Sequence, residues 1–191
     1  MKGLPSAVFL DRDGTIMEDA HYIKSPEQVR LIPGAAVAIK RLNDARIPVV
    51  VVTNQSGIAR GIFTVDDYEK VRLRFESLLK NQDARVDASY YCPHLPDDPP
   101  VCNCRKPATQ MFEQAIAELN LDAANAAYIG DRWRDVVAAK KLGGRGIMIE
   151  SSETSAEDRR RAREDGFETA PDLAAAVGKL LDGLTPRKRK P

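Results

Sequence analysis

The chain has 191 residues, with 29 Lys and Arg against 28 Asp and Glu, and 43% of its residues are hydrophobic. This composition is typical of a globular protein and excludes a chain that is disordered throughout. Four of the basic residues lie at 187–190, so the rest of the chain is slightly acidic and does not suggest a broad nucleic-acid-binding surface. The apolar runs are far shorter than the roughly 18 residues of a membrane span, and the first residues lack the apolar stretch of a signal peptide. We therefore expect a cytoplasmic protein that binds neither membrane nor nucleic acid, and by default a monomer.

Short apolar runs alternate with longer segments of helical spacing. In chain order, we expect a strand at 7–10, a helix at 35–45, a strand at 47–53, a helix at 65–79, a strand at 88–92, a helix at 110–119, a strand at 126–129, a helix at 135–142, a strand at 146–149, and helices at 155–165 and 172–181. This alternation predicts an α/β fold, with a Rossmann-like parallel sheet covered by helices on both faces. We expect a single domain over 1–183 and a basic, flexible tail at 184–191.

Two carboxylates follow the first expected strand at once. Asp11 and Asp13 flank Arg12, and Gly14 then allows a tight turn. Ligands bind at the carboxyl ends of parallel strands, and a carboxylate there can attack a phosphorus atom while its neighbour handles the leaving group's proton and Mg²⁺ offsets the negative charge. An acidic turn that closes the strand is the alternative interpretation.

Three further polar residues occur where the expected sheet edge would bring them near Asp11. Thr53 ends the second strand and could donate its hydroxyl to a phosphoryl oxygen, while Lys106 could stabilise the charge that develops on a transferring phosphoryl group. Asp131 follows the fourth strand and could bind Mg²⁺. Taken singly, these residues could be a turn residue, a surface cation and a helix N-cap. Their coincidence with Asp11 favours phosphoryl chemistry.

All three cysteines lie in or beside a segment, 93–107, that holds five of the twelve prolines. Cys92, His94, Cys102 and Cys104 offer three thiolates and one imidazole, which is a complete tetrahedral set for Zn²⁺. Since four protein ligands leave no open position, we predict a structural zinc that orders the loop 92–104 and fixes how Arg105 and Lys106 point. Ordinary loop cysteines are the alternative.

Four motifs in this order resemble those of the haloacid-dehalogenase-like (HAD) phosphatases: D-x-D-G-T at 11–15, Thr53 after the second strand, Lys106, and G-D-x-x-x-D at 130–135. The resemblance implies the HAD fold. The stretch between Thr15 and Ile47 has room for a loop and one helix but not for a large cap domain. The resemblance also implies that Asp11 is the nucleophile, forming an aspartyl-phosphate, and that Asp13 is the general acid and then the general base. Thr53 and Lys106 would stabilise the phosphoryl group. Asp11, the backbone carbonyl of Asp13, and Asp131 would hold Mg²⁺, and Asp135 would orient this site.

A narrower group is similar in the zinc array, the segment 51–61 and Cys-Arg-Lys-Pro at 104–107: the D-glycero-D-manno-heptose 1,7-bisphosphate 7-phosphatases. This likeness implies a small phosphorylated metabolite as substrate and removal of the 7-phosphate of that bisphosphate. Histidinol-phosphate phosphatases share almost all of these features and remain the alternative, with a nucleic-acid-end phosphatase or binder as a more distant one. The likeness also implies substrate contacts from Asp19, Ala20, His21, Tyr22, Asn54, Gln55, Ser56, Arg105 and Arg132, of which the two arginines would suit a second phosphate.

Overall fold

The computed structural model describes residues 3–96, 102–151 and 154–182, so the expected tail at 184–191 lies outside the described residues. Within these ranges one parallel sheet has the strand order β3-β2-β1-β4-β5-β6. The strands are β1 (Val8–Leu10), β2 (Val49–Asn54), β3 (Ala88–Cys92), β4 (Ala127–Gly130), β5 (Arg145–Ile149) and β6 (Glu168–Ala170). This confirms the predicted α/β class with a parallel sheet.

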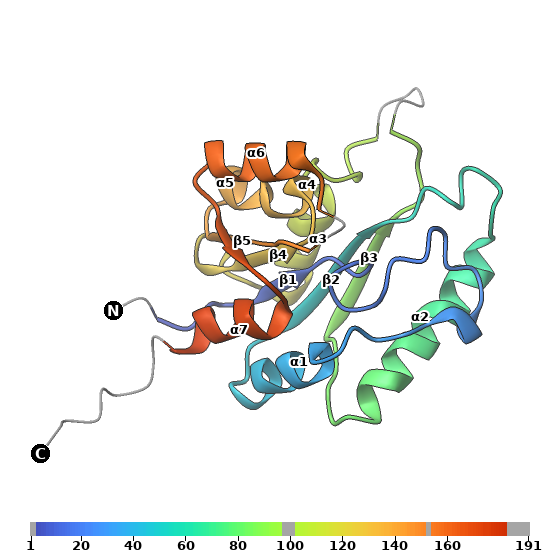
Figure 1. The fold of residues 1–191 in the computed structure, drawn as a ribbon, viewed down its shortest axis with the longest axis horizontal. Helices are drawn as coiled ribbons and strands as arrows, with labels where there is room; N and C mark the ends of the chain where they lie inside the picture. The colour runs from blue at the N-terminus through green and yellow to red at the C-terminus, as the bar shows by residue number, and fades with distance from the viewer. Residues whose placement is uncertain (1–2, 97–101, 152–153, 183–191) are drawn as a thin grey trace, which may run out of the picture.

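Helices cover both faces of the sheet. They are α1 (Ala35–Asp44), α2 (Val65–Lys80), α3 (Gln110–Leu119), α4 (Trp133–Val136), α5 (Ala138–Leu142), α6 (Ala156–Glu164) and α7 (Leu173–Leu181), with short 3₁₀ turns η1 (Pro26–Gln28) and η2 (Ala123–Asn125). Figure 1 shows α1, α2 and α7 on one side of the sheet and α4, α5 and α6 on the other. Two large buried clusters, one on each face, agree with this arrangement.

The alternation of side chains along β1 explains why each face has its own core. Val8 and Leu10 belong to the cluster that contains α1, α2 and α7, whereas Phe9 points to the opposite face. There the Phe9 ring stacks on Tyr128 at a centroid distance of 5.1 Å and meets Phe112 edge-on at 5.5 Å. A central strand with apolar residues on both faces is what a doubly covered parallel sheet requires.

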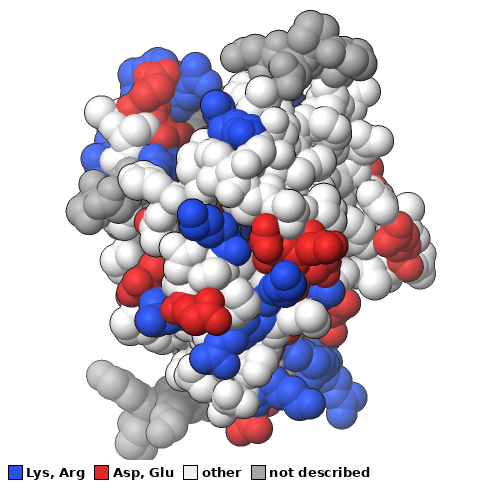
Figure 2. Space-filling model, turned by 90° about the vertical axis from the view of Figure 1, so that its right-hand side faces the viewer, with Lys and Arg blue, Asp and Glu red and all other residues white. Residues whose placement is uncertain are grey.

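Local signals define α2, the longest helix of the described part. Thr64 accepts a hydrogen bond from the backbone of Asp67, whose side chain bonds back to the backbone of Thr64. This capping box satisfies two backbone groups at the helix start. Figure 2 shows the side of the molecule that carries α2, where basic and acidic side chains intermix. Several of them form ion pairs along this helix.

One local prediction is wrong, and one strand was missed. The helix expected at 135–142 is two helices, α4 and α5, and α4 begins earlier, at Trp133, because the Asp135 carboxylate accepts a hydrogen bond from the backbone N–H of Arg132 and so caps the helix from inside. The strand β6 was not predicted, because only Ala170 of its three residues is buried and such a short strand carries no clear apolar pattern.

The connection from β1 to α1 contains little regular secondary structure. Among the described residues, the segment from β1 to α1 holds only the 3₁₀ turn η1, and no separate cap domain is inserted there. None of the described helices combines the length and the apolar character that a membrane crossing demands. The carboxyl ends of β1, β2 and β4, where the predicted site residues lie, are therefore not covered by a cap domain inserted between β1 and α1.

Candidate active site

The carboxyl ends of β1, β2 and β4 border a cavity of about 240 Å³. Of the predicted substrate-binding residues, Asp19, His21, Tyr22, Asn54, Gln55, Ser56, Arg105 and Arg132 line it, together with Asp11, Asp13, Thr53 and Asp131. Ala20 is exposed and is not part of the lining. The lining also includes residues that the sequence analysis did not assign to the substrate, namely Arg12, Ile23, Gly57 and Arg134.

Lys106 lies behind the cavity wall, with only 2% of its surface exposed. Its ammonium group is 2.5 Å from Oδ1 of Asp11 and 2.7 Å from Oδ1 of Asp135, and it donates to the backbone carbonyl of Val52 at 2.6 Å. Lys106 thus has two hydrogen-bond acceptors, Asp11 and Val52, and an ion pair with Asp135, which together fix the buried cation beside Asp11. Asp11 and Lys106, which are 95 residues apart in the chain, are therefore one unit.

Asn54 explains how Lys106 is held in this position. The Asn54 amide donates to the carbonyl of Lys106 at 3.1 Å, and the backbone N–H of Lys106 donates to Oδ1 of Asn54 at 3.0 Å. This reciprocal pair ties the end of β2 to the segment before α3. Asn54 thus has a positioning contact in addition to its place in the cavity lining.

Asp11, Asp131 and Asp135 each bring a carboxylate oxygen to within 4.8 Å of the others. Burial, together with nearby carboxylates, raises the pKa of Asp11 to about 6, although Lys106 opposes the shift. Burial and the charges of Asp135 and Asp11 raise the pKa of Asp131 to about 8. Such crowding of oxygen ligands fits a hard divalent cation such as Mg²⁺, which would remove the repulsion.

Asp135 differs from the other two carboxylates because both of its oxygens are engaged. Oδ1 contacts Lys106, and Oδ2 accepts the backbone N–H of Arg132 at 3.0 Å. This arrangement agrees with the orienting role expected for Asp135.

Gly14 makes room for this carboxylate group. It has a left-handed φ of +78°, and a Cβ at this position would lie 2.7 Å from Oδ2 of Asp131. Any side chain here would therefore carry both a backbone cost and a clash with the predicted metal ligand.

Asp13 is held from three sides. Arg12 donates through Nε and Nη2 to the two carboxylate oxygens, each at 3.1 Å, and Gln55 donates to Oδ2 at 2.7 Å. Thr53, the third neighbour, lies 3.5 Å from the same oxygen. Gln55 was expected to contact substrate, and its amide also joins Asp13 to Thr53, to which it donates at 2.9 Å.

Three partly accessible arginines add positive charge to the cavity wall. Arg105 donates to the backbone carbonyl of His94 at 3.0 Å, and Arg132 lies 3.2 Å from Asp131. Arg134, whose side chain is 47% exposed, is the third, and the sequence signal for it was the basic run around Trp133. Trp133 itself faces away from the cavity lining and donates to Asp165 at 2.6 Å.

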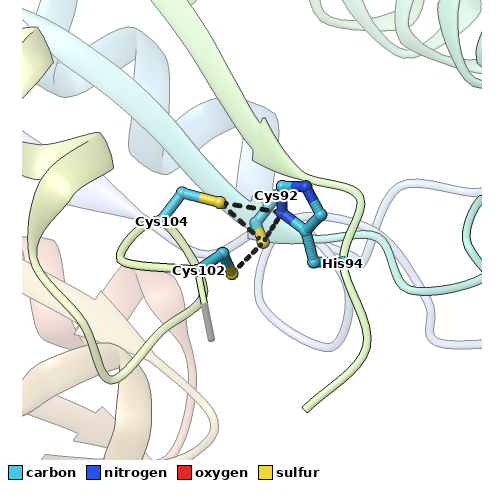
Figure 3. A group of neighbouring side chains, drawn as sticks. All are labelled: Cys92, His94, Cys102 and Cys104. Atoms are coloured by element: carbon cyan, nitrogen blue, oxygen red, sulfur yellow. Dashed lines mark hydrogen bonds between the residues drawn. The ribbon is translucent and has the colours of Figure 1, made fainter. Parts of the chain in front are cut away.

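The expected zinc ligands are gathered beside Arg105. Figure 3 shows Cys92, His94, Cys102 and Cys104 pointing toward one another from β3 and the loop that follows it. The Cys92 sulfur is 2.9 Å from that of Cys104 and 3.6 Å from that of Cys102, and Nδ1 of His94 is 3.2 Å from Cys104. Tetrahedral sulfur ligands at a Zn–S distance of about 2.3 Å stand roughly 3.8 Å apart, so the Cys92–Cys102 separation fits zinc, whereas Cys92 and Cys104 must move apart to hold the ion.

The ionisation of these thiols depends on the same contacts. Burial raises the pKa values of Cys92 and Cys104. For Cys102 burial is outweighed by hydrogen bonds from the backbone of Arg105 and from the other two thiols, which lower the pKa to about 7. A thiolate is thus accessible near neutral pH, as metal binding needs.

The chain is similar to known proteins in sequence and in structure. Residues 103–176 match the family described as "HAD-hyrolase-like". The D-glycero-beta-D-manno-heptose-1,7-bisphosphate 7-phosphatase of Haemophilus ducreyi is 41% identical over 142 residues, which cover 72% of this chain and 78% of that protein. The protein of the same name from Bordetella bronchiseptica is 34% identical over 175 residues, covering 91% of this chain and 97% of the relative.

A solved structure extends the likeness to three dimensions. The D,D-heptose 1,7-bisphosphate phosphatase of B. bronchiseptica, complexed with magnesium and phosphate, superposes with a TM-score of 0.81 at 33% identity. The superposition covers 93% of this chain and 99% of that one.

Proposed function

Since the chain belongs to the D-glycero-D-manno-heptose-1,7-bisphosphate 7-phosphatases, phosphoric monoester hydrolases of the HAD superfamily, we propose that it removes the 7-phosphate of this bisphosphate. The observation that carries the proposal is the buried Asp11–Lys106 pair beside Asp131, facing a cavity that Arg105, Arg132 and Arg134 border. A nucleophile fixed by a cation, next to oxygen ligands for a metal, is suited to phosphoryl transfer.

The first step forms an aspartyl-phosphate. A carboxylate oxygen of Asp11 attacks the phosphorus atom, and the bond from phosphorus to the sugar oxygen breaks. Asp13, whose side chain is 22% exposed on the cavity side, gives its proton to the departing oxygen. Lys106 and the Thr53 hydroxyl stabilise the negative charge of the phosphoryl oxygens.

The second step regenerates the enzyme. Asp13, ionised after the first step, takes a proton from a water molecule, whose oxygen attacks the phosphorus atom of the aspartyl-phosphate. The bond between phosphorus and the Asp11 oxygen breaks, inorganic phosphate leaves, and the Asp11 carboxylate is regenerated. The same side chain therefore serves as acid and then as base, which the cavity position of Asp13 supports.

Two metals complete the proposal. Asp11, the backbone carbonyl of Asp13 and Asp131 would hold Mg²⁺, which supplies positive charge opposite the phosphoryl oxygens. The four ligands Cys92, His94, Cys102 and Cys104 would hold a structural Zn²⁺. Because Arg105 bonds to the carbonyl of His94, the zinc loop supports the cavity wall.

The positive cavity wall favours a substrate with a second phosphate. Arg105, Arg132 and Arg134 can supply forked donors to an anion that lies away from Asp11. A cationic amine, as in histidinol phosphate, would face repulsion from the same side chains.

Phosphate release with Mg²⁺ tests the proposal, using heptose 1,7-bisphosphate and histidinol phosphate side by side. We expect kcat/KM to favour the bisphosphate by about 100-fold, which corresponds to roughly 2.7 kcal/mol of transition-state discrimination. Asp11→Asn, which keeps the size of the side chain, should remove turnover of both substrates without loss of the fold. Equal or reversed preference would contradict the proposed substrate, and full activity of Asp11→Asn would contradict the proposed chemistry.

The remaining expectations about partners stay predictions. A gel shift with DNA or RNA that weakens with salt would revive the nucleic-acid-end alternative. Light scattering of the pure protein would test the expected monomer.

A further inference from the structure

We propose that Arg12 is a positioning residue that holds the Asp13 carboxylate in place for both proton transfers, an inference that rests on the function proposed above for Asp13. In the sequence, Arg12 is only the residue between two carboxylates. In the structure, its contacts indicate that it holds the Asp13 carboxylate.

The contacts between Arg12 and Asp13 form a fork. Nε reaches Oδ1 and Nη2 reaches Oδ2, both at 3.1 Å, so the plane of the guanidinium fixes the plane of the carboxylate. Gln55 adds a second donor to Oδ2 at 2.7 Å. Gln55 alone would leave Oδ1 of Asp13 without a side-chain donor, and the carboxylate could then rotate about its bond to Cβ.

Arg12 is itself held firmly, with only 3% of its surface exposed. Its guanidinium carbon lies 5.4 Å from the centre of the Tyr68 ring on α2, and that ring packs against Tyr91 of β3 with a centroid distance of 4.2 Å. An arginine can stack on an aromatic ring and fork a carboxylate at the same time. The orientation of Asp13 is therefore fixed by a buried side chain that packs on α2 and, through Tyr68, on β3.

Burial of Arg12 is costly, which argues for a specific use. Among the residues that the structure describes, its Nη1 atom is buried without a hydrogen-bond acceptor. A buried donor left without a partner destabilises a protein. A surface-facing or apolar side chain would avoid this cost, so the retained fork to Asp13 is its most direct explanation.

A positioning role predicts that the loss depends on the leaving group. A sugar oxygen must be protonated as it departs, whereas the p-nitrophenolate anion is stable without a proton. Loss of the Arg12 fork should therefore slow the first step for a sugar phosphate but not for p-nitrophenyl phosphate. The second step, in which Asp13 takes a proton from water, should be slow for both substrates.

The experiment compares Arg12→Met with the wild-type enzyme in steady-state and rapid-mixing assays with Mg²⁺. On the heptose bisphosphate we expect kcat to fall by about 100-fold with KM changed less than about threefold, because a catalytic group misplaced by 1 Å can cost that much. On p-nitrophenyl phosphate we expect a rapid burst of one nitrophenolate per enzyme, followed by slow turnover. Guanidinium chloride at millimolar concentration should partly restore kcat of Arg12→Met.

Two controls make the outcome decisive. Arg72→Met removes an arginine that forks Glu69 and Glu76 on α2, away from the cavity lining, and should keep wild-type kinetics. Asp13→Asn should give the same pattern of losses as Arg12→Met, and larger ones. If Arg12→Met does not fold, Arg12→Lys takes its place, and we expect an intermediate loss of kcat, because an ammonium group cannot form the fork.

The Asp13 and Arg12 variants distinguish the role of Arg12 from the role of Asp13. If Asp13→Asn leaves kcat on both substrates unchanged, the proposed role of Asp13 fails. A different result concerns Arg12 alone. If Asp13→Asn shows the burst, but the Arg12 variant has equally reduced kcat on both substrates without a burst, or a change in KM only, the positioning role of Arg12 is overturned. The proposed function then stands.

Discussion

Replacing Lys106 by Met tests whether the buried ion pairs at the sheet edge hold the site together. Lys106 is 2% exposed and contacts Asp11 and Asp135, so its loss leaves two buried carboxylates without their cation. Breaking a buried pair in this way costs about 3–5 kcal/mol. In a chain of this length, each kcal/mol lowers the melting temperature by roughly 2–4 °C, so we expect a decrease of about 10 °C in the metal-free protein.

The same substitution should reduce catalysis separately from stability. Removing a preorganised donor to a developing negative charge lowers kcat by about 10²–10³-fold. Differential scanning calorimetry in EDTA gives the change in stability, and phosphate release at a temperature where both proteins are folded gives the change in kcat. Mg²⁺ should recover more stability in Lys106→Met than in wild type, because the metal can replace part of the missing positive charge.

Lys70→Met is the matched control. Lys70 is 64% exposed and lies 3.7 Å from Asp67 on α2, so its removal should change stability by less than about 0.5 kcal/mol. A melting temperature of Lys106→Met within about 2 °C of that of Lys70→Met would refute the reasoning, because it would mean that the buried carboxylates do not depend on this cation.

Three further predictions concern the metals and Gly14. In the metal-free protein the pKa values of Asp11 (about 6) and Asp131 (about 8) lie above the unfolded value of about 3.9, so their contribution to stability is present below about pH 4 and is lost as pH rises toward 8. The rise in melting temperature caused by Mg²⁺ should therefore be larger at pH 8 than at about pH 5, and Asp131→Asn should flatten this difference. Cys102→Ser should lower the zinc content measured by mass spectrometry and speed proteolysis of the loop, whereas Cys102→His, which keeps a zinc ligand, should lose less; equal zinc in all three proteins would count against the site. Gly14→Ala should weaken Mg²⁺ binding in titration calorimetry, since its Cβ would meet Asp131, while Gly61→Ala shares the left-handed φ but has open space and should leave Mg²⁺ affinity unchanged; similar affinities would contradict the steric argument.

Most of the element order could be predicted from the sequence because its causes are local. Apolar runs such as the one at 49–52 mark buried strands, and the cap at Thr64 with the buried face of α2 marks a helix. The residues at strand ends could be grouped for the same reason, since parallel strands bring their carboxyl ends to one edge. The four predicted zinc ligands were proposed from their spacing alone, and the structure places them together.

The partners of the charged side chains could not be predicted in this way. The contact of Lys106 with Asp135, the reciprocal hydrogen bonds between Asn54 and Lys106, and the place of Arg134 in the cavity all join segments that are distant in the chain or depend on the turn of a short helix. The stacking of Arg12 on Tyr68 likewise depends on how α2 packs against the sheet. Periodicity and caps determine which segments fold and which residues reach the sheet edge, whereas the packing of helices on the two faces decides which side chain meets which, because that choice is made by close contacts between segments far apart in sequence.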